Sequence, residues 1–474
     1  MRFTLRAGAA GMHQSHPKRT NQYAMAAKTK RTRPKKSISS PKTFHPDAAG
    51  IDLGATVHYV AVPAGRDPRP VRNFGTQTAD LNTLADWLKE CSITTVAMEA
   101  TGVYWIPLYQ ILEARGFEVR LVNARHVKNV PGRKSDVQDC QWLQYLHSVG
   151  LLNGSFRPPA AICAVRSLLR HRESLMRSAC QHLLRVQKAL DQMNVQLHHA
   201  VSDITGLTGL AILDAIVAGE RSPAALARLR HYRCQKSELE IAKALEGDWR
   251  EEHLFTLRQS LEAWRFHQKL MGECDQQIAG HMDALEDQGE ATAQPPAKAW
   301  AKQADEPMRQ QLLAKFGVDL TEVEGISLQT ALVFLGEVGT DVSKFASAEH
   351  FASWLGLCPD NRITGGRTHD AHTRKVKNRL ATALRMAVQS LHRSKGELGD
   401  WFRRLRSKLG TKAATTGAAH KLARVLYAMV KHRRPYDRNR LGNPELRRAR
   451  KERSLRRQAE ALGFALTPLA GEVS

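Results

Sequence analysis

The sequence has no CxxC pair, no run of about 18 apolar residues, and no Asp or Glu among its first 46 residues. Seven cysteines, an odd number without CxxC spacing, argue against a disulfide framework and against a zinc ribbon, and indicate a reducing compartment. Without a long apolar run, no membrane span is expected. Aromatic residues are also sparse, at 6%.

Acidic residues are outnumbered throughout: 71 Lys and Arg stand against 46 Asp and Glu, a net charge of +25. This excess indicates a polyanionic partner, because phosphate contacts supply most of the affinity of basic proteins for nucleic acids. The basic residues recur near 133, 374–379 and 403–457, which disfavours a neutral enzyme with a basic tail. Residues 1–46 hold eleven Lys or Arg, so we expect a disordered nucleic-acid-touching arm, although a transit peptide would share this composition.

Residues 47–155 alternate short apolar runs with helical patterns. The runs are AAGIDLGATVHYVAV, TTVAMEA and EVRLVNA, and helices are predicted near 79–91, 103–115 and 136–148. Strands alternating with helices predict an α/β sheet, parallel wherever a helix crosses over. Functional residues then belong at the carboxyl ends of the strands.

Residues 160–300 have coiled-coil periodicity instead. One seam of apolar residues repeats at spacings of four and three: Leu175, Ala179, Leu183, Val186, Leu190, Met193 and Leu197. A second seam runs through Leu257, Leu261, Trp264, Met271, Ile278, Met282 and Leu285. Two long helices with a connector predict an antiparallel helical hairpin or a dimerisation arm. The Pro-bearing stretch 288–300 reads as a linker.

Residues 305–435 predict another, mostly helical unit, and 436–474 a basic tail with an exposed helix. Gly325, between Val323 and Ile326, resembles the turn of a helix-hairpin-helix element, which offers backbone N–H groups to phosphate. A glycine that merely caps an ordinary turn explains this segment equally well.

Four carboxylates occur where a strand should end or a helix begin: Asp52 in GIDLGAT, Glu99 in VAMEATG, and Asp136 with Asp139 in PGRKSDVQD. Acids placed this way converge, and they repel one another unless a cation lies between them. Hard divalent ions such as Mg²⁺ take oxygen ligands, and two-metal sites clamp a phosphodiester during cleavage.

The helix of the acidic pair is predicted to begin at Asp136, because Ser135 and Gln138 have the spacing of a capping box. A spacing of three puts Asp136 and Asp139 on one face. The alternative is a pair of acids that only complements the helix dipole. The neighbouring Arg133 and Lys134 favour a site that handles phosphate.

Asp52 and Glu99 have alternatives of their own. Asp-x-Gly-x-Thr after a strand also cradles phosphates in actin-like kinases, but those proteins need a second copy of the motif, which the sequence lacks. Gly54 permits a sharp turn and close approach of a ligand. A lone strand-end Glu such as Glu99 is usually a solvated rim residue, so its significance depends on the other acids.

A last group lies downstream, in LGLCPDNRITGG and HTRKVKNRLATALR. The Thr364 hydroxyl precedes a Gly365–Gly366 turn, and candidate nucleic-acid-binding residues follow: Arg374, Lys375, Lys377, Asn378, Arg379 and Arg385. A hydroxyl backed by cations suits a nucleophile that attacks phosphate. A phosphate-contact loop with a structural threonine is the simpler alternative for this segment alone.

Together these segments, in order from about 48 to 435, resemble the DEDD transposases of bacterial insertion sequences, the RNA-guided bridge recombinases. The resemblance implies a RuvC-like, RNase H-related amino-terminal domain, a coiled-coil arm and a carboxyl-terminal transposase domain. It makes Asp52, Glu99, Asp136 and Asp139 a metal-binding tetrad for Mg²⁺, with Mn²⁺ as a substitute. It also places a serine nucleophile in the turn at 363–366, where this chain has Thr364.

The resemblance further implies Mg²⁺-dependent cleavage and rejoining of DNA through a covalent intermediate, guided by a non-coding bridge RNA. A homodimer or homotetramer in the bacterial cytoplasm, associated with the nucleoid, is expected. Two alternatives stay open: a RuvC-like nuclease that uses water, and an inactive relic that only binds nucleic acid.

Overall fold

The computed structural model describes residues 42–100, 102–123, 135–289, 306–370, 372–374, 376–437, 444–465 and 467. The chain divides into two compact units, an amino-terminal unit (Met1–Phe156) and a carboxyl-terminal unit (Arg157–Ser474). Most of the predicted basic arm and of the linker at 288–300 lies outside the described residues. Among the helices in these ranges, none combines the length and the apolar character that crossing a membrane requires.

The amino-terminal unit is built on one mixed sheet. Its strands are β1 (Ala48–Leu53), β2 (Val57–Ala61), β3 (Val71–Gly75), β4 (Thr95–Glu99) and β5 (Glu118–Val122). They lie in the order β3-β2-β1-β4-β5. The β1–β2 and β2–β3 pairs are antiparallel, and the β1–β4 and β4–β5 pairs are parallel. The sheet and its helices confirm the α/β prediction for this part of the chain.

The apolar run at 48–62 contains two strands, because the chain reverses at Gly54. The Gly54 N–H donates to the Val57 carbonyl at 3.1 Å. A Cβ at Gly54 would lie 2.4 Å from that same oxygen, so the turn itself requires glycine. The sequence analysis missed β3, whose mostly exposed residues lack apolar alternation; pairing with β2 makes it an edge strand.

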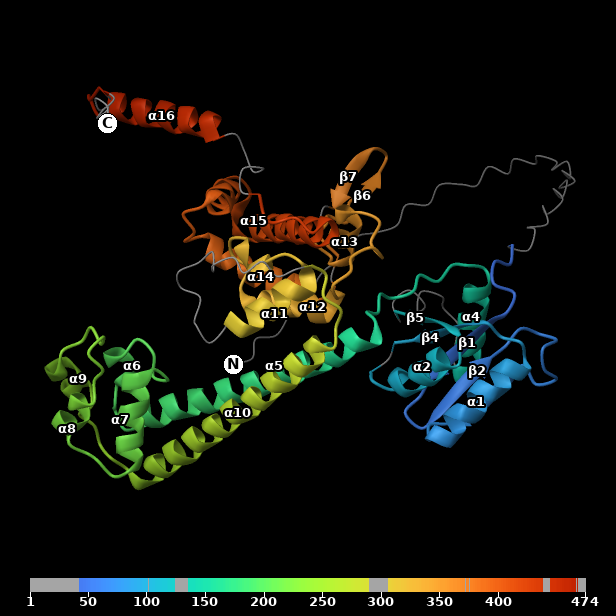
Figure 1. Ribbon diagram of the computed structural model, residues 1–474, viewed down its shortest axis with the longest axis horizontal. Coiled ribbons are helices and arrows are strands. Elements are labelled where there is room, and N and C mark those ends of the chain that lie inside the picture. Colours follow the sequence, from blue (N-terminus) through green and yellow to red (C-terminus); the bar gives the residue numbers. More distant parts are fainter. Residues whose placement is uncertain are drawn as a thin grey trace, which may run out of the picture. The chain divides into compact units, whose positions relative to one another are not determined.

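Helices cover both faces of the sheet, as Figure 1 shows. One face packs against α1 (Thr78–Glu90) and α2 (Trp105–Ala114), with Ile51, Val96 and Met98 in the core. The other face packs against α4 (Asp136–Ser148), whose Leu143 and Leu146 contact Ala97 and Val122. All three helices agree closely with their predicted ranges.

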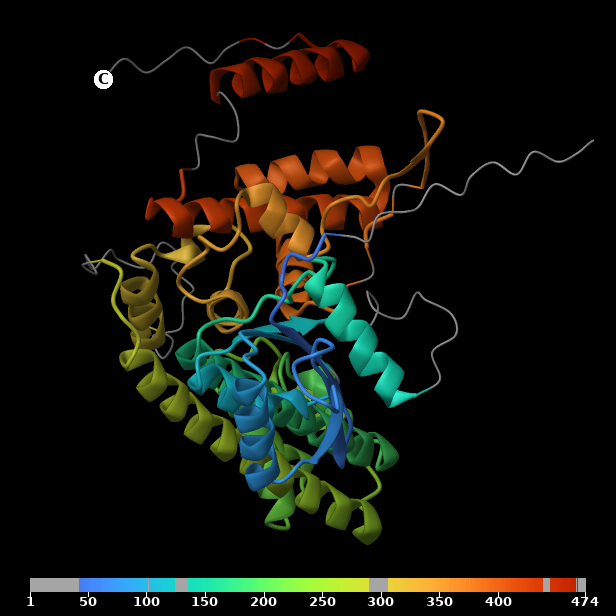
Figure 2. The ribbon, with the colours of Figure 1, turned by 90° about the vertical axis from the view of Figure 1, so that its right-hand side faces the viewer.

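The carboxyl-terminal unit begins with two long helices that lie side by side (Figures 1 and 2), α5 (Ala160–Gln192) and α10 (Glu251–Asp283). Between them come α6 (Leu197–Ala200), α7 (Leu207–Val217), α8 (Pro223–Arg228) and α9 (Glu238–Ala244). Leu175 and Ala179 pack with Met271 and Cys274. Further along, Leu190 packs with Leu257, so the two helices are antiparallel. Most of the predicted seam residues are buried.

The rest of this unit is mostly helical. It comprises α11 (Glu306–Phe316), the short turn η2 (Leu320–Glu322), α12 (Leu328–Val338), α13 (Ala348–Trp354), β6 (Arg362–Thr364), β7 (Arg367–Asp370), α14 (Arg379–Leu391), α15 (Glu397–His432) and α16 (Pro444–Ala461). A break at Gly410, with φ of 74°, divides α15. Gly325 has φ of 89°, and a Cβ there would lie 2.9 Å from the Ala387 carbonyl oxygen. The Gly325 turn therefore packs against α14, and a phosphate contact there stays a prediction.

His147, in the last turn of α4, is fully buried and neutral. Its Nε2 lies 2.9 Å from the Thr95 hydroxyl oxygen, and that hydroxyl lies 3.1 Å from the Glu118 carbonyl oxygen. The hydroxyl donates to Glu118, so the imidazole donates through Nε2–H and its Nδ1 carries no proton. Among the described residues Nδ1 has no hydrogen-bond partner. Burial lowers the pKa of His147 from 6.5 to about 4.

This lowered pKa predicts acid-sensitive packing of α4. The neutral imidazole contributes stability above pH 6.5, and this contribution is lost as the pH falls toward 4, because only the unfolded state then binds the proton readily. We expect His147→Gln to remove about 2 kcal/mol of the difference in unfolding free energy between pH 7 and pH 4.5. Hydrogen exchange of the α4 amides in increasing urea, at each pH, measures this free energy. The exposed His171→Gln is the control, and an unchanged pH difference in His147→Gln contradicts the assignment.

Candidate active site

The ends of two adjacent parallel strands position the first two acids. In the β1–β4 ladder Gly50 pairs with Ala97 and Ile51 with Met98, so the next pair is Asp52 with Glu99. Adjacent strands lie about 4.8 Å apart, and side chains alternate between the faces of a sheet. Asp52 and Glu99 therefore share the face of Gly50 and Ala97, which α4 covers.

Helix α4 crosses this face antiparallel to β1. The Gln144 side-chain amide donates to the Ala48 carbonyl at 3.2 Å, near the start of the strand. A Cβ at Gly50 would lie 2.2 Å from the Gln144 backbone nitrogen and 2.5 Å from the Cys140 carbonyl oxygen. The helix backbone thus lies directly on Gly50, and its amino-terminal end is directed toward Asp52.

The helix begins where the sequence predicts. The Ser135 hydroxyl accepts from the Gln138 backbone N–H at 3.4 Å, and Asp136 is the first helical residue. Asp136 and Asp139 both lie in the first turn. The spacing that the sequence analysis singled out therefore sets both carboxylates at the end of the helix that faces the strand ends.

Three of the carboxylates are close enough to Asp52 to affect its charge. The pKa of Asp52 is raised from 3.8 to about 6, first by burial and then by repulsion from Asp136, Asp139 and Glu99. The structure thus gathers into one neighbourhood four acids that come from three separate segments. A cation placed among them would relieve this repulsion.

The site fits a hard divalent cation in donor type and in charge, since all four side chains offer carboxylate oxygens. Within the described ranges, however, no three His, Cys, Asp or Glu residues lie close enough to share one ion. Coordination needs oxygens at about 2.0–2.6 Å from the ion, whereas charge repulsion acts over longer distances. Asp136 is exposed, and Asp52, Glu99 and Asp139 are partly exposed, so a cation from solvent can reach these side chains.

Thr364 lies in the other unit, at the tip of the β6–β7 hairpin that Figure 1 shows. It pairs with Arg367 across a two-residue turn, in which Gly365 and Gly366 have φ of 58° and 76°. Glycine adopts two such angles in succession with little strain, so the turn accounts for both residues. The Thr364 residue is exposed. The hydroxyl and the carboxylates therefore come from separate units of the fold.

Part of the predicted basic cluster has structural roles. The Arg374 guanidinium donates to the Ser353 carbonyl at 2.5 Å and to its hydroxyl at 2.8 Å. Arg379 forms an ion pair with Glu173 of α5. Asn378 caps α14, because its side-chain oxygen accepts from the Ala381 N–H at 3.0 Å.

Nucleic-acid binding stays a prediction for every residue of this cluster. Lys377 is exposed and Arg385 is half-buried. Arg133, Lys134 and Lys375 lie outside the described residues.

Comparison with known proteins gives matches at both ends of the chain. Residues 49–195 match a family model described as a transposase, and residues 319–402 match the "Transposase IS116/IS110/IS902 family". A "Probable family 20 transposase" of Pseudomonas aeruginosa is 24% identical over 364 residues, which cover 73% of this chain and 86% of the relative. An IS116 insertion-element protein of Streptomyces clavuligerus is 24% identical over 408 residues, covering 81% and 94%. An IS110 insertion-element protein of Streptomyces coelicolor is 30% identical over 115 residues, covering 24% and 28%.

The sequence analysis overlooked Gly50 as a positioning residue. A small residue two positions before Asp52, on the same face of an otherwise apolar strand, was the available signal.

We expect Gly50→Ala to lower the unfolding free energy of the amino-terminal unit by about 1–3 kcal/mol, because the new Cβ meets backbone atoms of α4 that cannot rotate away. As α4 shifts, Asp136 and Asp139 move from Asp52, and the pKa of Asp52 falls from about 6 toward 3.8. Urea unfolding and NMR titration of the Asp52 carboxyl, both in EDTA, measure the two effects. Gly154→Ala is the matched control, since its Cβ would meet nothing closer than 3.9 Å. An unshifted Asp52 titration in Gly50→Ala contradicts the positioning role.

Proposed function

Because this chain belongs to the IS110/IS116/IS902 family of insertion-sequence transposases, whose activity is the recombination of DNA, we propose that its four gathered carboxylates form the Mg²⁺-dependent cleavage site. The observation that carries the proposal is the gathering of the four acids: burial raises the pKa of Asp52 most, and repulsion from Asp136, Asp139 and Glu99 raises it further. A mixed sheet with acids at the ends of adjacent parallel strands supports a RuvC-like assignment of this unit.

Mg²⁺ held by Asp52, Glu99, Asp136 and Asp139 would supply Lewis-acid polarisation of a scissile phosphate, and Mn²⁺ would substitute for it. The protein's own contribution is to hold four acids together against their repulsion. Gly50 lets α4 lie on the sheet, and the Ser135 cap fixes where the helix begins.

The hydroxyl of Thr364 is the proposed nucleophile. Its Oγ1 attacks the phosphorus, and the bond from phosphorus to the 3′ oxygen breaks. This leaves a protein–5′-phosphate ester and a free 3′ hydroxyl, which takes up a proton while Oγ1 loses one. Attack by a second 3′ hydroxyl on the ester reverses the step and releases Thr364, so rejoining needs no ATP.

The proposed nucleophile and the proposed metal-binding acids lie in separate units of the chain, which is compatible with a site shared between two copies of the protein. Thr364 belongs to the carboxyl-terminal unit and the acids to the amino-terminal unit. In a homodimer or homotetramer, the hairpin of one copy would complete the carboxylate site of another. The paired helices α5 and α10 are candidates for the coiled-coil arm that joins the copies.

We further propose that a bridge RNA guides the reaction and that the protein reads nucleic-acid backbone. The net charge of +25 and the exposed basic residues support a second polyanion beside DNA. Specificity would then reside in base pairing.

Asp136→Asn and Asp139→Asn are expected to lower the Mg²⁺-dependent cleavage rate by about a hundredfold or more, since each removes one charge from the metal site. Calorimetric titration with Mg²⁺ should show weakened binding by the same variants, while their DNA affinity in EDTA stays near that of the parent. Glu90→Gln, an exposed acid of the same unit, is the control. Parent-like cleavage by Asp136→Asn removes the acids from the mechanism. If the parent does not cleave DNA with any divalent ion, even when its RNA is present, it is the binding-only relic.

Thr364→Ala should form no covalent adduct on a nicked suicide DNA substrate, as resolved by denaturing gel electrophoresis. Thr364→Ser should form the adduct at least as fast as the parent, because serine lacks the methyl group that restricts χ1 and crowds the approach. The exposed Thr382→Ala serves as control. Undiminished cleavage by Thr364→Ala would instead favour the RuvC-like nuclease, in which water is the nucleophile.

A further inference from the structure

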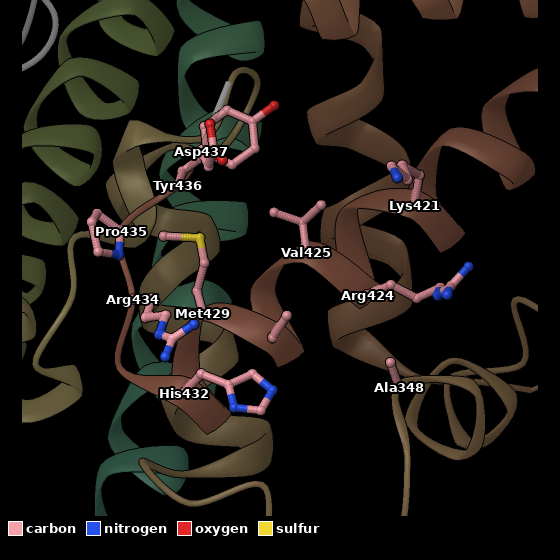
Figure 3. A pocket seen from close by; sticks show the side chains of 11 residues that line it. Ala348, Lys421, Arg424, Val425, Met429, His432, Arg434, Pro435, Tyr436 and Asp437 are labelled. Carbon is pink, nitrogen blue, oxygen red and sulfur yellow. The ribbon is translucent and has the colours of Figure 1, made fainter. Parts of the chain in front are cut away.

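A groove lies between the last part of α15 and the segment at 434–437, which follows that helix (Figure 3). Its volume is about 860 Å³, within the range of about 300–1,000 Å³ typical of pockets that take organic groups. Lys421, Arg424 and His432 line it from one face of α15, at spacings of three and eight. Arg434 and Tyr436 line it from the following segment.

The cations of the groove are only partly neutralised. Arg424 forms an ion pair with Glu349 at 2.7 Å, and Asp437 is the other carboxylate at the groove. In the part of the chain that the structure describes, no hydrogen bond or ion pair engages the side chains of Lys421, His432 or Arg434. Burial and the neighbouring Arg424 lower the pKa of Lys421, so an anion bound beside it would stabilise its charge.

The groove also has an apolar wall. In Figure 3 the side chains of Val425 and Met429 lie between the Lys421–Arg424 side and the Tyr436 side. Met429 is buried and Val425 is half-buried, so both offer a firm apolar surface. Cations beside an apolar and aromatic surface are the pattern of sites that hold one nucleic-acid strand, with phosphates on the cations and bases on the flat surface.

We propose that this groove binds a single-stranded segment of nucleic acid, with backbone phosphates at Lys421, Arg424 and Arg434 and a base against Val425, Met429 and Tyr436. A duplex would present its phosphates outside and its bases stacked inside, so it would leave the apolar wall uncovered. The inference rests on the proposed function, since a transposase that is guided by RNA handles separated strands. DNA and RNA share this chemistry.

The test measures the affinity of full-length protein for fluorescent strands of about 12 nucleotides by anisotropy in EDTA. It compares single-stranded DNA, RNA of the same sequence, and the DNA duplex. We expect Lys421→Ala with Arg434→Ala to weaken single-strand binding about tenfold and to reduce the salt slope by about 1.4, the value for two lost phosphate contacts. The duplex should lose less. The single strand, DNA or RNA, whose affinity falls more identifies which nucleic acid the groove binds.

The matched control is Arg404→Ala with Lys412→Ala, which removes the same charge from exposed positions of α15 outside the groove. Equal losses in the two double variants, or equal losses for duplex and single strand, overturn the proposal. Circular dichroism melting of each variant checks that the fold is kept.

A gain of affinity provides a second measurement that misfolding cannot imitate. Glu349→Gln removes the carboxylate that pairs with Arg424, so single-strand binding should tighten about two- to threefold. No change in affinity would contradict the role of Arg424. These measurements contain no divalent ion, so they test the groove independently of the carboxylate site. Either proposal can be contradicted while the other holds.

Discussion

The close contact between α4 and Gly50 is the constraint on which the amino-terminal unit depends. Side chains normally separate the backbone of a helix from the sheet on which it packs. Here the backbone of α4 lies against Gly50, which has no side chain. The helix is also antiparallel to β1, so its first turn reaches the strand end that carries Asp52. This geometry gathers the acids although they repel one another. The packing of apolar residues on α4, such as Leu143, offsets that repulsion.

The repulsion is itself informative about function. A fold stable without a ligand would rarely gather four acids at the end of its sheet, since three of them disfavour the ionised form of Asp52. Proteins retain such unfavourable clusters at sites where a ligand relieves them. The exposed Thr364 hairpin shows the opposite design, in which two glycines fix a hydroxyl at a tip, free of packing. The acids thus belong to one unit, and the hydroxyl lies on an exposed hairpin of the other.

Some contacts and one strand could not be inferred from the sequence, because they depend on tertiary structure. Nucleic-acid binding by Arg374, Asn378 and Arg379 stays a prediction. The structure adds that Arg374 binds Ser353, Asn378 caps α14 and Arg379 pairs with Glu173. Cation density alone cannot separate these roles, because a guanidinium that binds a carbonyl and one that binds phosphate have the same sequence signature. Strand β3 was missed because an exposed edge strand needs no apolar alternation.

By itself the sequence determined the alternation of strands and helices, the start of α4 at Asp136 and the placement of each acid at an element's end. These features follow from local rules of periodicity, capping and turn formation, which act over a few residues. Only the tertiary structure decided that α4 covers the face of Asp52 and Glu99, and that its backbone contacts Gly50. Such choices depend on contacts between residues far apart in the sequence, as in the bond from Gln144 to Ala48, 96 positions apart, which no local pattern encodes.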